Sequence, residues 1–420
     1  MSLRKTTLVS AFAAAILVVS ACSPGGDEQS PPAGNNEAPQ TSEPVQEDVQ
    51  ASGKAAVDAP ASELRAGLTH LLTEHVYRAG IAVKTAVEAG GKMNDPTVKA
   101  AVASLDENSV DLSKAIGSVY PDAEKPFLES WRQHIGFFVD YTLGKATKDN
   151  AKVAQAQKDL EGYRTSFGEL INSVNKELPA DAVAAELKPH VASVLTAIDS
   201  VVANDGKAFA KLRTAAEHMP HTAAILAGGI AKDKKLEGDT AGDAAELRSG
   251  LTYLLTEHVD LAGITVVQAV SKGGDMNDPS VKAAADALDA NSVELSKAIG
   301  SVYPDAEKPF LEAWRQHIGF FVDYTLAKAT KDKAMAAQAQ KDLDGYRTSF
   351  GELINSVNKE LPADAVAAEL KPHVASLSAA IDSVVAGDGK AFAKLAEASG
   401  HMPHTAATLA GGIAEDKKLG

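Results

Sequence analysis

Apolar positions recur at helical spacing along most of this chain. The clearest stripe is aromatic, and its members follow one another at intervals of three or four residues: Phe127, Trp131, His134, Phe138 and Tyr141. This spacing brings side chains onto one face of an α-helix. No segment shows the sustained alternation of apolar and polar residues that a half-buried strand requires. The pattern therefore predicts an all-α protein, with an imidazole in the middle of its most aromatic helix.

The same pattern occurs twice. The segment WRQHIGFFVDYT begins at Trp131 and returns letter for letter at Trp314, an offset of 183 residues. At this offset residues 64–236 align without a gap with residues 247–419, and most positions are identical. Each copy has the size of an ordinary domain. The sequence thus predicts two tandem up-and-down helical bundles related by internal duplication.

Each copy contains about six amphipathic patterns separated by helix-breaking signals. Gly90 and Gly91 end the first pattern, and Asp95 followed by Pro96 begins the second. These are the residues expected at a helix C-terminus, at an N-cap and at the first helical position. The sixth pattern crosses Pro220, which we expect to kink its helix because proline removes a backbone hydrogen bond. Short connections favour antiparallel neighbours, so we expect about six helices in each bundle.

The first residues have the features of an export signal. Arg4 and Lys5 precede an apolar run from Leu8 to Val19, which is too short to be a permanent membrane span. The next residues complete the sequence VSAC, which resembles a bacterial lipobox ending in Cys22. In a lipobox the cysteine carries the lipid and becomes the new N-terminus. We therefore expect a lipoprotein signal peptide over residues 1–21 and a protein lipid-anchored on the outer side of the cell membrane. An ordinary signal peptide with an incidental cysteine is the alternative.

The segment that follows the cysteine has a different composition. Residues 23–60 are rich in Pro, Gly, Gln and Glu and lack an apolar period. Such a segment cannot bury enough apolar surface to fold, so we expect a disordered tether. The predicted division is then Cys22 and the tether over residues 22–60, a first bundle over 61–236, a linker over 237–243 and a second bundle over 244–420.

Charge and cysteine content narrow the possible partners. The chain has 56 acidic against 41 basic residues, a formal net charge of −15. No basic face is visible, which argues against a nucleic-acid partner. Cys22 is the single cysteine, so neither disulfides nor thiolate metal ligands are available to the bundles. Imidazole, carboxylate and thioether groups remain as candidate ligands.

Ten of the eleven histidines form five pairs at the offset of 183, and His70 is replaced by Tyr253. Because most positions are retained between the copies, this pairing is weak support for function. Their placement is more informative. Three histidines per copy lie on the apolar stripes of three different helices, and the motif HMPH adds two more beside a methionine. The candidate ligands are His75, His134, His190, His218, His221 and Met219 in the first copy, and His258, His317, His373, His401, His404 and Met402 in the second.

Imidazoles from several helices of one bundle can hold a metal ion. Imidazole with thioether suits copper, and imidazole with a carboxylate from Glu74 or Glu186 suits zinc or iron. Glu-x-x-His pairs are absent from the core faces, so a di-iron centre is disfavoured, and haem would need more room. We therefore expect a copper or zinc site in each bundle, for storage, buffering or delivery of the ion.

Two other classes of function compete with this interpretation. In a structural or interaction lipoprotein the histidines would simply pack in the core, since a buried histidine on an apolar face usually has that role. Catalysis has little support, because the chain lacks a phosphate-binding glycine loop, a thiol nucleophile in the bundles and a GxSxG turn.

Several motifs together resemble a family. The combination LRxGLTxLLTEHVxxAG, WRQHIGFFVDYT, GYRTSF and HMPHTAxxLAGGI is similar to uncharacterised secreted or lipid-anchored helical proteins of Bacillales and actinobacteria. The resemblance covers both copies. It implies a helical fold and an extracytoplasmic location, and it implies no activity.

Overall fold

The computed structural model describes residues 52–420. These residues form fifteen α-helices and two short 3-10 turns, and they contain no strand. The all-α prediction is confirmed. The predicted signal peptide, Cys22 and the tether up to residue 51 lie outside the described residues.

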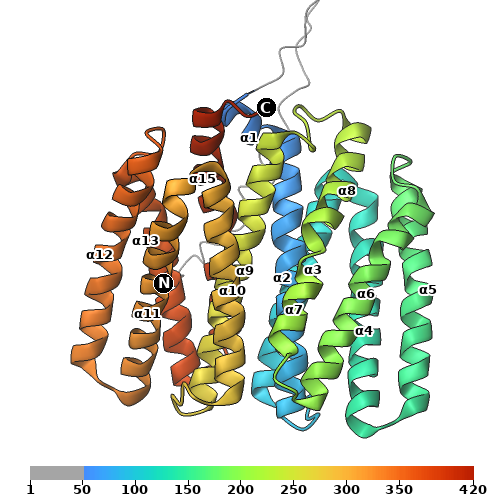
Figure 1. Ribbon diagram of the computed structural model, residues 1–420. Coiled ribbons are helices and arrows are strands. Elements are labelled where there is room, and N and C mark those ends of the chain that lie inside the picture. Colours follow the sequence, from blue (N-terminus) through green and yellow to red (C-terminus); the bar gives the residue numbers. More distant parts are fainter. Residues whose placement is uncertain (1–51) are drawn as a thin grey trace, which may run out of the picture. The chain divides into compact units, whose positions relative to one another are not determined.

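In the first repeat, each helix from α2 (Pro60–Glu88) to α6 (Ala180–Ala203) packs against the next along the chain, and α8 (Met219–Lys234) returns to α2 (Figure 1). This is the expected arrangement of antiparallel neighbours. A 3-10 turn, η1, spans Pro121–Ala123. The helices of the first repeat are α2 Pro60–Glu88, α3 Pro96–Val119, α4 Glu124–Thr147, α5 Asn150–Val174, α6 Ala180–Ala203, α7 Ala208–Ala216 and α8 Met219–Lys234.

The second repeat has the same order of elements. Its 3-10 turn, η2, spans Pro304–Ala306. Its helices are α9 Asp243–Ser271, α10 Pro279–Val302, α11 Glu307–Thr330, α12 Lys333–Val357, α13 Ala363–Ala386, α14 Ala391–Ser399 and α15 Met402–Lys417.

Local signals fix the helix ends where the sequence indicates them. The side chain of Asp95 accepts hydrogen bonds from the backbone N–H groups of Thr97 and Val98 at the start of α3. This satisfies amide groups that have no partner within the helix. Gly90 follows α2 with a φ of 65°, and Asn204 ends α6 in the left-handed conformation with a φ of 50°. Glycine and asparagine adopt such angles more readily than other residues.

The sixth amphipathic pattern is two helices rather than one kinked helix. α7 ends at Ala216 and α8 begins at Met219, so the chain breaks at Glu217 and His218. Pro220 lies in the first turn of α8, where its missing N–H has no intrahelical partner to lose. The predicted kink at Pro220 is therefore wrong, and the physical reason is that proline starts a new helix here. The same break separates α14 from α15.

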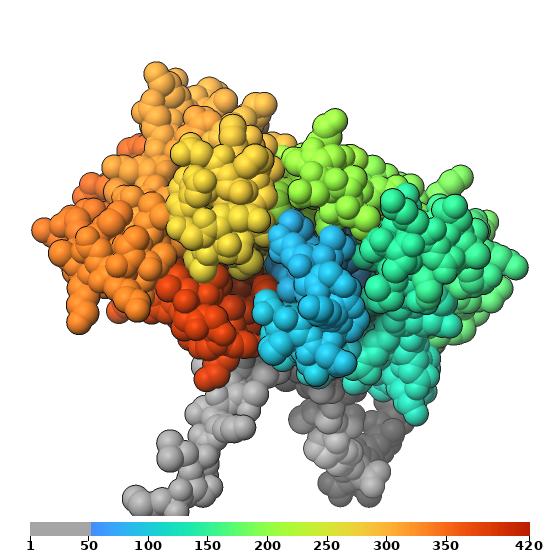
Figure 2. All heavy atoms as spheres, turned by 90° about the horizontal axis from the view of Figure 1, so that it is seen from below, coloured from blue at the N-terminus to red at the C-terminus, as the bar shows by residue number. Residues whose placement is uncertain are grey.

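The two repeats pack against each other as one unit. α2 lies along α9 in the middle of Figure 1. The core cluster of the first repeat includes Leu261 and Ile264 of α9 and Leu288 of α10. Seen from below in Figure 2, the red segment around α14 adjoins the blue segment around α3, and these two helices are in contact. The apolar core therefore continues from one repeat into the other.

Residues before the predicted end of the tether at residue 60 already form helical structure. Lys54–Val57 forms a short helix, α1, and Val57 is fully buried. Arg248 donates a hydrogen bond to the carbonyl of Val57, and its counterpart Arg65 donates to the carbonyl of Thr240, each at 2.7 Å. Val57 and Thr240 are also 183 residues apart. The end of the predicted tether is thus the first repeat's counterpart of the linker.

Candidate metal centre

Three helices of the first repeat bring one imidazole each to a common place in the core. His75 of α2, His134 of α4 and His190 of α6 are all buried, and these three helices contact one another. The Nε2 atoms of His134 and His75 lie 3.4 Å apart. The ring centroids of His75 and His190 lie 6.5 Å apart. The apolar stripes of three separate helices therefore converge on a histidine cluster.

The second repeat holds a tighter version of this cluster. The Nε2 atoms of His317 and His258 lie 3.3 Å apart, and the ring centroids of His258 and His373 lie 6.2 Å apart. One nitrogen from each of these three residues lies within 4.8 Å of the other two. This buried triad, His258, His317 and His373, could hold a metal ion.

Aromatic rings fix the orientation of the imidazoles. In the first repeat the ring of His134 stacks on Tyr163 at 4.9 Å between centroids, and Trp131 meets it edge-on at 4.6 Å. Trp131 also lies 4.9 Å from His75. The second repeat repeats these contacts through Tyr346 and Trp314. Because close-packed rings have few alternative rotamers, His134 and His317 are held in place before any ligand arrives.

Burial keeps these imidazoles neutral. In the second repeat it lowers the pKa of His258 to about 3, with His373 adding to the effect, and lowers the pKa of His373 to about 4. Burial, with both neighbouring imidazoles, lowers the pKa of His317 well below its ordinary value. The first repeat shows the same shifts. At neutral pH each imidazole therefore retains a lone pair, as a metal ligand must.

The Nδ1 atoms of all six imidazoles are buried and make no hydrogen bond of normal geometry, although the backbone of Trp131 and of Trp314 lies close enough to His134 and His317 to raise their pKa against the effect of burial. A buried polar atom in this state costs about 1–3 kcal/mol, so a histidine with only a packing role would ordinarily donate to a carbonyl. The Oδ1 atoms of Asn108 and Asn291 are also buried and unpartnered. The Asn108 side chain lies close enough to His75 to counteract the lowering of its pKa by burial. The cluster thus contains unmatched donors and acceptors.

The separation of the paired nitrogens matches coordination to a shared ion. With metal–nitrogen bonds of about 2.0–2.1 Å, trigonal or tetrahedral geometry puts two ligand nitrogens about 3.3–3.6 Å apart. The Nε2 pairs lie at 3.4 Å and 3.3 Å. These distances exceed the usual range of about 2.7–3.2 Å for a hydrogen bond from an N–H group. Each pair forms a long imidazole–imidazole hydrogen bond, at a spacing that two ligands of a single ion would also have.

The fourth predicted histidine lies at the edge of each cluster. His218 stands at the N-cap position of α8, without a capping hydrogen bond from its side chain, and is half-buried. Its proximity adds to the effect of burial in lowering the pKa of His190. His401 has the same relation to His373. These two residues are therefore close to the triads.

The fifth predicted histidine of each repeat does not join the buried cluster. The side chains of His221 and His404 are 72% and 77% exposed, and their Nε2 atoms lie 3.5 Å and 3.3 Å from carboxylate oxygens of Glu186 and Glu369. These two histidines therefore lie outside the buried triads, and their role as ligands stays a prediction. The reason for their position is geometric, because a step of three residues from His218 turns the side chain about 60° around the helix, out of the core.

Met219 and Met402 are buried in the apolar core at the starts of α8 and α15. Their packing partners are core residues of the two main apolar clusters. A role for their thioether groups as ligands stays a prediction.

The carboxylates that the sequence suggested as ligands are engaged elsewhere. Glu74 accepts hydrogen bonds from Arg78 at 2.5 Å and from Asn108 at 3.4 Å. Burial alone would raise its pKa, but Arg78 and His70 outweigh this effect and lower it. Glu186 accepts a hydrogen bond from the Thr222 hydroxyl at 2.9 Å. Each triad is therefore composed of neutral imidazoles without these carboxylates.

Comparison of this chain with protein-family models, curated proteins and solved structures finds no match. Within residues 52–420, no helix combines the length and the apolar character needed to cross a bilayer. The case for a metal site at the triads therefore depends on the geometry described above.

Proposed function

We propose that this protein binds one metal ion in each repeat, for storage, buffering or delivery, and that copper(I) is the favoured ion. The observation that carries the proposal is the convergence of three buried imidazole nitrogens within 4.8 Å in the second repeat, with the same residues similarly arranged in the first. Closing this group around an ion needs a movement of about 1.3 Å at most to reach ligand spacing. Rotation of the His373 ring would supply it in the second repeat, and the first repeat, in which the corresponding rings lie further apart, needs a larger movement.

The charge of the surroundings favours a monovalent ion. The triads lie among aromatic and aliphatic side chains, and the nearby buried carboxylate Glu74 is paired with Arg78. The cost of burying an ion grows with the square of its charge, and an uncompensated dication would be several times as costly as a monocation. Copper(I) accepts three imidazole ligands and carries a single charge. Zinc, with the same ligands and an open fourth position near His218 or His401, is the second candidate.

The second coordination shell also supports a ligand role in the first repeat. Histidines that bind a metal usually donate the proton of their other nitrogen to an oxygen acceptor. His75 has an unpartnered Nδ1, and the nearby Asn108 has an unpartnered Oδ1. A hydrogen bond between them would fix the tautomer in which Nε2 offers its lone pair. In the second repeat the Oδ1 atom of Asn291, the counterpart of Asn108, is likewise buried and unpartnered.

Metal titration of the purified protein, without a histidine tag, tests the proposal. The protein is stripped with chelator and titrated anaerobically with copper(I), then separately with zinc(II), and bound metal is counted by elemental analysis. We expect two equivalents for the wild type and one each for His134→Ala and His317→Ala. The double variant should bind none. His221→Ala and His404→Ala are the matched controls and should keep two equivalents, because these side chains are exposed.

Thermal unfolding gives an independent measure of the same binding. An ion at a hundred times its dissociation constant stabilises the folded state by about 2.7 kcal/mol per site. The absence of bound metal and of any stabilisation by either ion would refute the proposal. It would then favour the alternative, a structural or interaction lipoprotein whose histidines only pack in the core.

We further propose that the protein acts at the outer side of the cell membrane, anchored by a lipid on Cys22. The lipobox-like residues 19–22 support this location. A Cys22→Ala variant should lose incorporation of labelled palmitate and move from the membrane fraction to the soluble fraction. Unchanged labelling and fractionation would refute the anchor without affecting the metal proposal.

A further inference from the structure

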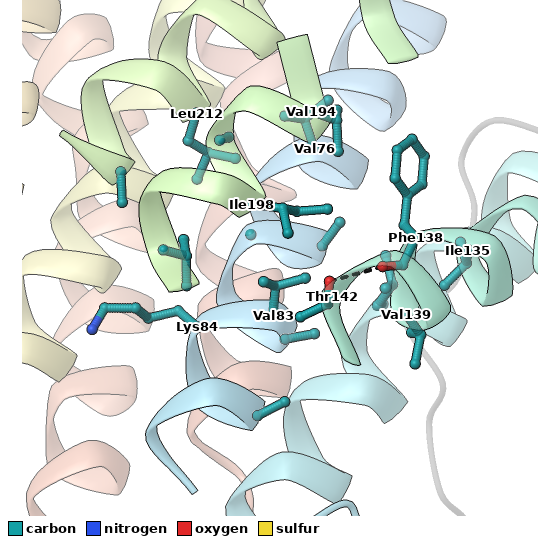
Figure 3. A pocket seen from close by; sticks show the side chains of 18 of the residues that line it. Val76, Val83, Lys84, Ile135, Phe138, Val139, Thr142, Val194, Ile198 and Leu212 are labelled. Carbon is teal, nitrogen blue, oxygen red and sulfur yellow. Dashed lines mark hydrogen bonds between the residues drawn. The ribbon is translucent and has the colours of Figure 1, made fainter. Parts of the chain in front are cut away.

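An apolar cavity of about 130 Å³ adjoins the histidine cluster of the first repeat, and His75 and His190 form part of its wall. Figure 3 shows Val76, Val83, Val194, Ile198 and Leu212 around it. These side chains come from α2, α6 and α7. The cavity therefore lies inside the first repeat, beside the candidate metal centre.

The lining offers few free polar groups. Apart from the two histidines, polar side-chain atoms come from Thr142 and Lys84. The Thr142 hydroxyl donates to the carbonyl of Phe138 at 2.8 Å, as the dashed line in Figure 3 shows. The Lys84 ammonium group pairs with Glu88. A cavity of this kind does not hold ordered water well, because water needs several polar partners.

The cavity reaches the surface beside two unusual side chains. Among the large hydrophobic residues that the structure describes, Met93 and Val102 stand out as exposed, at 38% and 39%. Both line the cavity. Exposed apolar side chains at the mouth of an apolar cavity are typical of a site that admits an apolar molecule.

The second repeat lacks an equivalent space. The corresponding residues of α9, α13 and α14 line a cavity of only about 10 Å³. Val194, which is half-buried, is replaced by Leu377, which is 1% exposed and part of the core. At the mouth, Lys84 and Val102 are replaced by Val267 and Ala285. The first repeat thus has the cavity, and in the second repeat the larger side chain of Leu377 occupies the corresponding position.

We propose that the first repeat binds a small, uncharged apolar molecule in this cavity, next to the imidazoles, and that the second repeat does not. Cavities of about 150 Å³ lined by aliphatic and aromatic side chains bind benzene and xenon. An apolar molecule of that size fills the space and meets only the two imidazoles among the polar side chains that lack a hydrogen-bond or ion-pair partner. This binding needs no metal ion, so it is independent of the function proposed above. A molecule bound here would lie against His75 and His190 and could contact an ion held by them.

Benzene and xenon are the probes for the experiment, with benzoate as a charged compound of similar size. The full-length protein, stripped of metal, is titrated with benzene by calorimetry and examined with xenon by ¹²⁹Xe NMR. We expect one equivalent of benzene to bind, a xenon signal in exchange with one site, and no binding of benzoate. Failure of benzene and xenon to bind the wild type, or equal binding of benzoate, would overturn the proposal.

Two reciprocal variants locate the site. Val194→Leu introduces the residue of the second repeat and should abolish benzene binding, and Leu377→Val should create a second site. Ala86→Leu fills the cavity from a half-buried position on α2, so it tests the site even if Val194→Leu folds poorly. Circular dichroism checks that each variant is folded. Retention of benzene binding in folded Val194→Leu and Ala86→Leu would overturn the assignment to this cavity.

Discussion

Lowering the pH from 7 to 5 should unfold this protein or open its bundles, because six imidazoles are buried in the neutral form. Burial is the main cause of a lowered pKa in all six. It lowers the pKa of His75 and His258 to about 3 and that of His190 and His373 to about 4. The pKa of His134 and His317 is lowered well below the ordinary value. In the unfolded chain these groups titrate at about 6.5. Below that pH the unfolded state binds more protons than the folded state. Stability is therefore complete above about pH 6.5 and falls as the pH decreases toward the folded pKa values.

The size of the effect follows from the number of histidines. Each one lowers the free energy of unfolding by about 1.4 kcal/mol per pH unit below 6.5. At pH 5 the loss is about 2 kcal/mol for each histidine and about 12 kcal/mol for six. A typical protein is stable by about 5–15 kcal/mol in total. The loss is thus comparable with the whole stability, and burial of His70, whose pKa is also lowered mainly by burial, acts in the same direction.

Urea unfolding followed by tryptophan fluorescence measures this loss between pH 7.5 and 5. The chain has two tryptophans, and each lies within 5 Å of triad imidazoles between ring centroids. Their fluorescence therefore reports directly on the clusters. Copper(I) should shift the acid transition to lower pH, because bound imidazoles cannot be protonated until the ion leaves.

The slope of stability against pH gives the sharpest comparison. His317→Gln removes one titrating group and should reduce the slope by about 1.4 kcal/mol per pH unit. His404→Gln is the matched control and should leave the slope nearly unchanged, because this side chain is 77% exposed. Constant stability from pH 7 to pH 5 would refute the reasoning, as would equal slopes in the wild type and His317→Gln.

Three further predictions concern packing, the interface between the repeats and the second shell of the candidate metal centre. Gly168→Ala should destabilise the protein by about 1–3 kcal/mol in thermal unfolding, because the new Cβ would lie 2.2 Å from the carbonyl oxygen of Ala180. Gly136→Ala is the control. Nothing lies within 4 Å of its new Cβ, so it should stabilise α4 by about 0.5–1 kcal/mol. Arg213→Ala should lower the free energy of unfolding in urea by about 3–5 kcal/mol, because it leaves the fully buried Glu257 without its cation. Arg132→Ala breaks an ion pair that is half exposed, so it should lower the free energy of unfolding by less than about 1 kcal/mol. Asn108→Leu should weaken ion binding in the first repeat by about 10–100-fold in calorimetry while leaving the second site unchanged, and equal affinities before and after the substitution would exclude Asn108 as the acceptor for His75.

Much of the fold follows from local signals in the sequence. Asp95 caps α3 and Asn204 ends α6 in the left-handed conformation, as their residue types indicate. The apolar stripes also place His75, His134 and His190 inward on three helices, and the structure brings them together. Periodicity could not predict whether the three histidines lie at the same level along the axis of the bundle. The meeting of the three imidazoles depends on how the helices slide past one another during packing.

The interface between the repeats could not be predicted from the same signals. Arg65, Thr69, Glu74 and Arg78 are polar residues of α2, and the structure buries all four. Thr69 meets Ser249 of α9, and Arg65 donates to the carbonyl of Thr240 before α9. Glu74 and Arg78, on the other side of α2, hydrogen-bond to α3. Glu74 and Arg78 stand four residues apart, a spacing that usually marks an exposed ion pair. Only the arrangement of the two bundles distinguishes a buried pair from an exposed one.

The charges at this interface make the two repeats unequal partners. Glu74 and its counterpart Glu257 are both buried, and each is paired with one arginine: Glu74 with Arg78, and Glu257 with Arg213. Both arginines belong to the first repeat, whereas the second repeat has Leu261 and Ala396 at the equivalent positions. A pair of second repeats would bury two glutamates without these cations, and a buried unpaired charge is strongly destabilising. The second repeat therefore depends on the first for the charge balance of its central helix, while each repeat retains its own histidine triad.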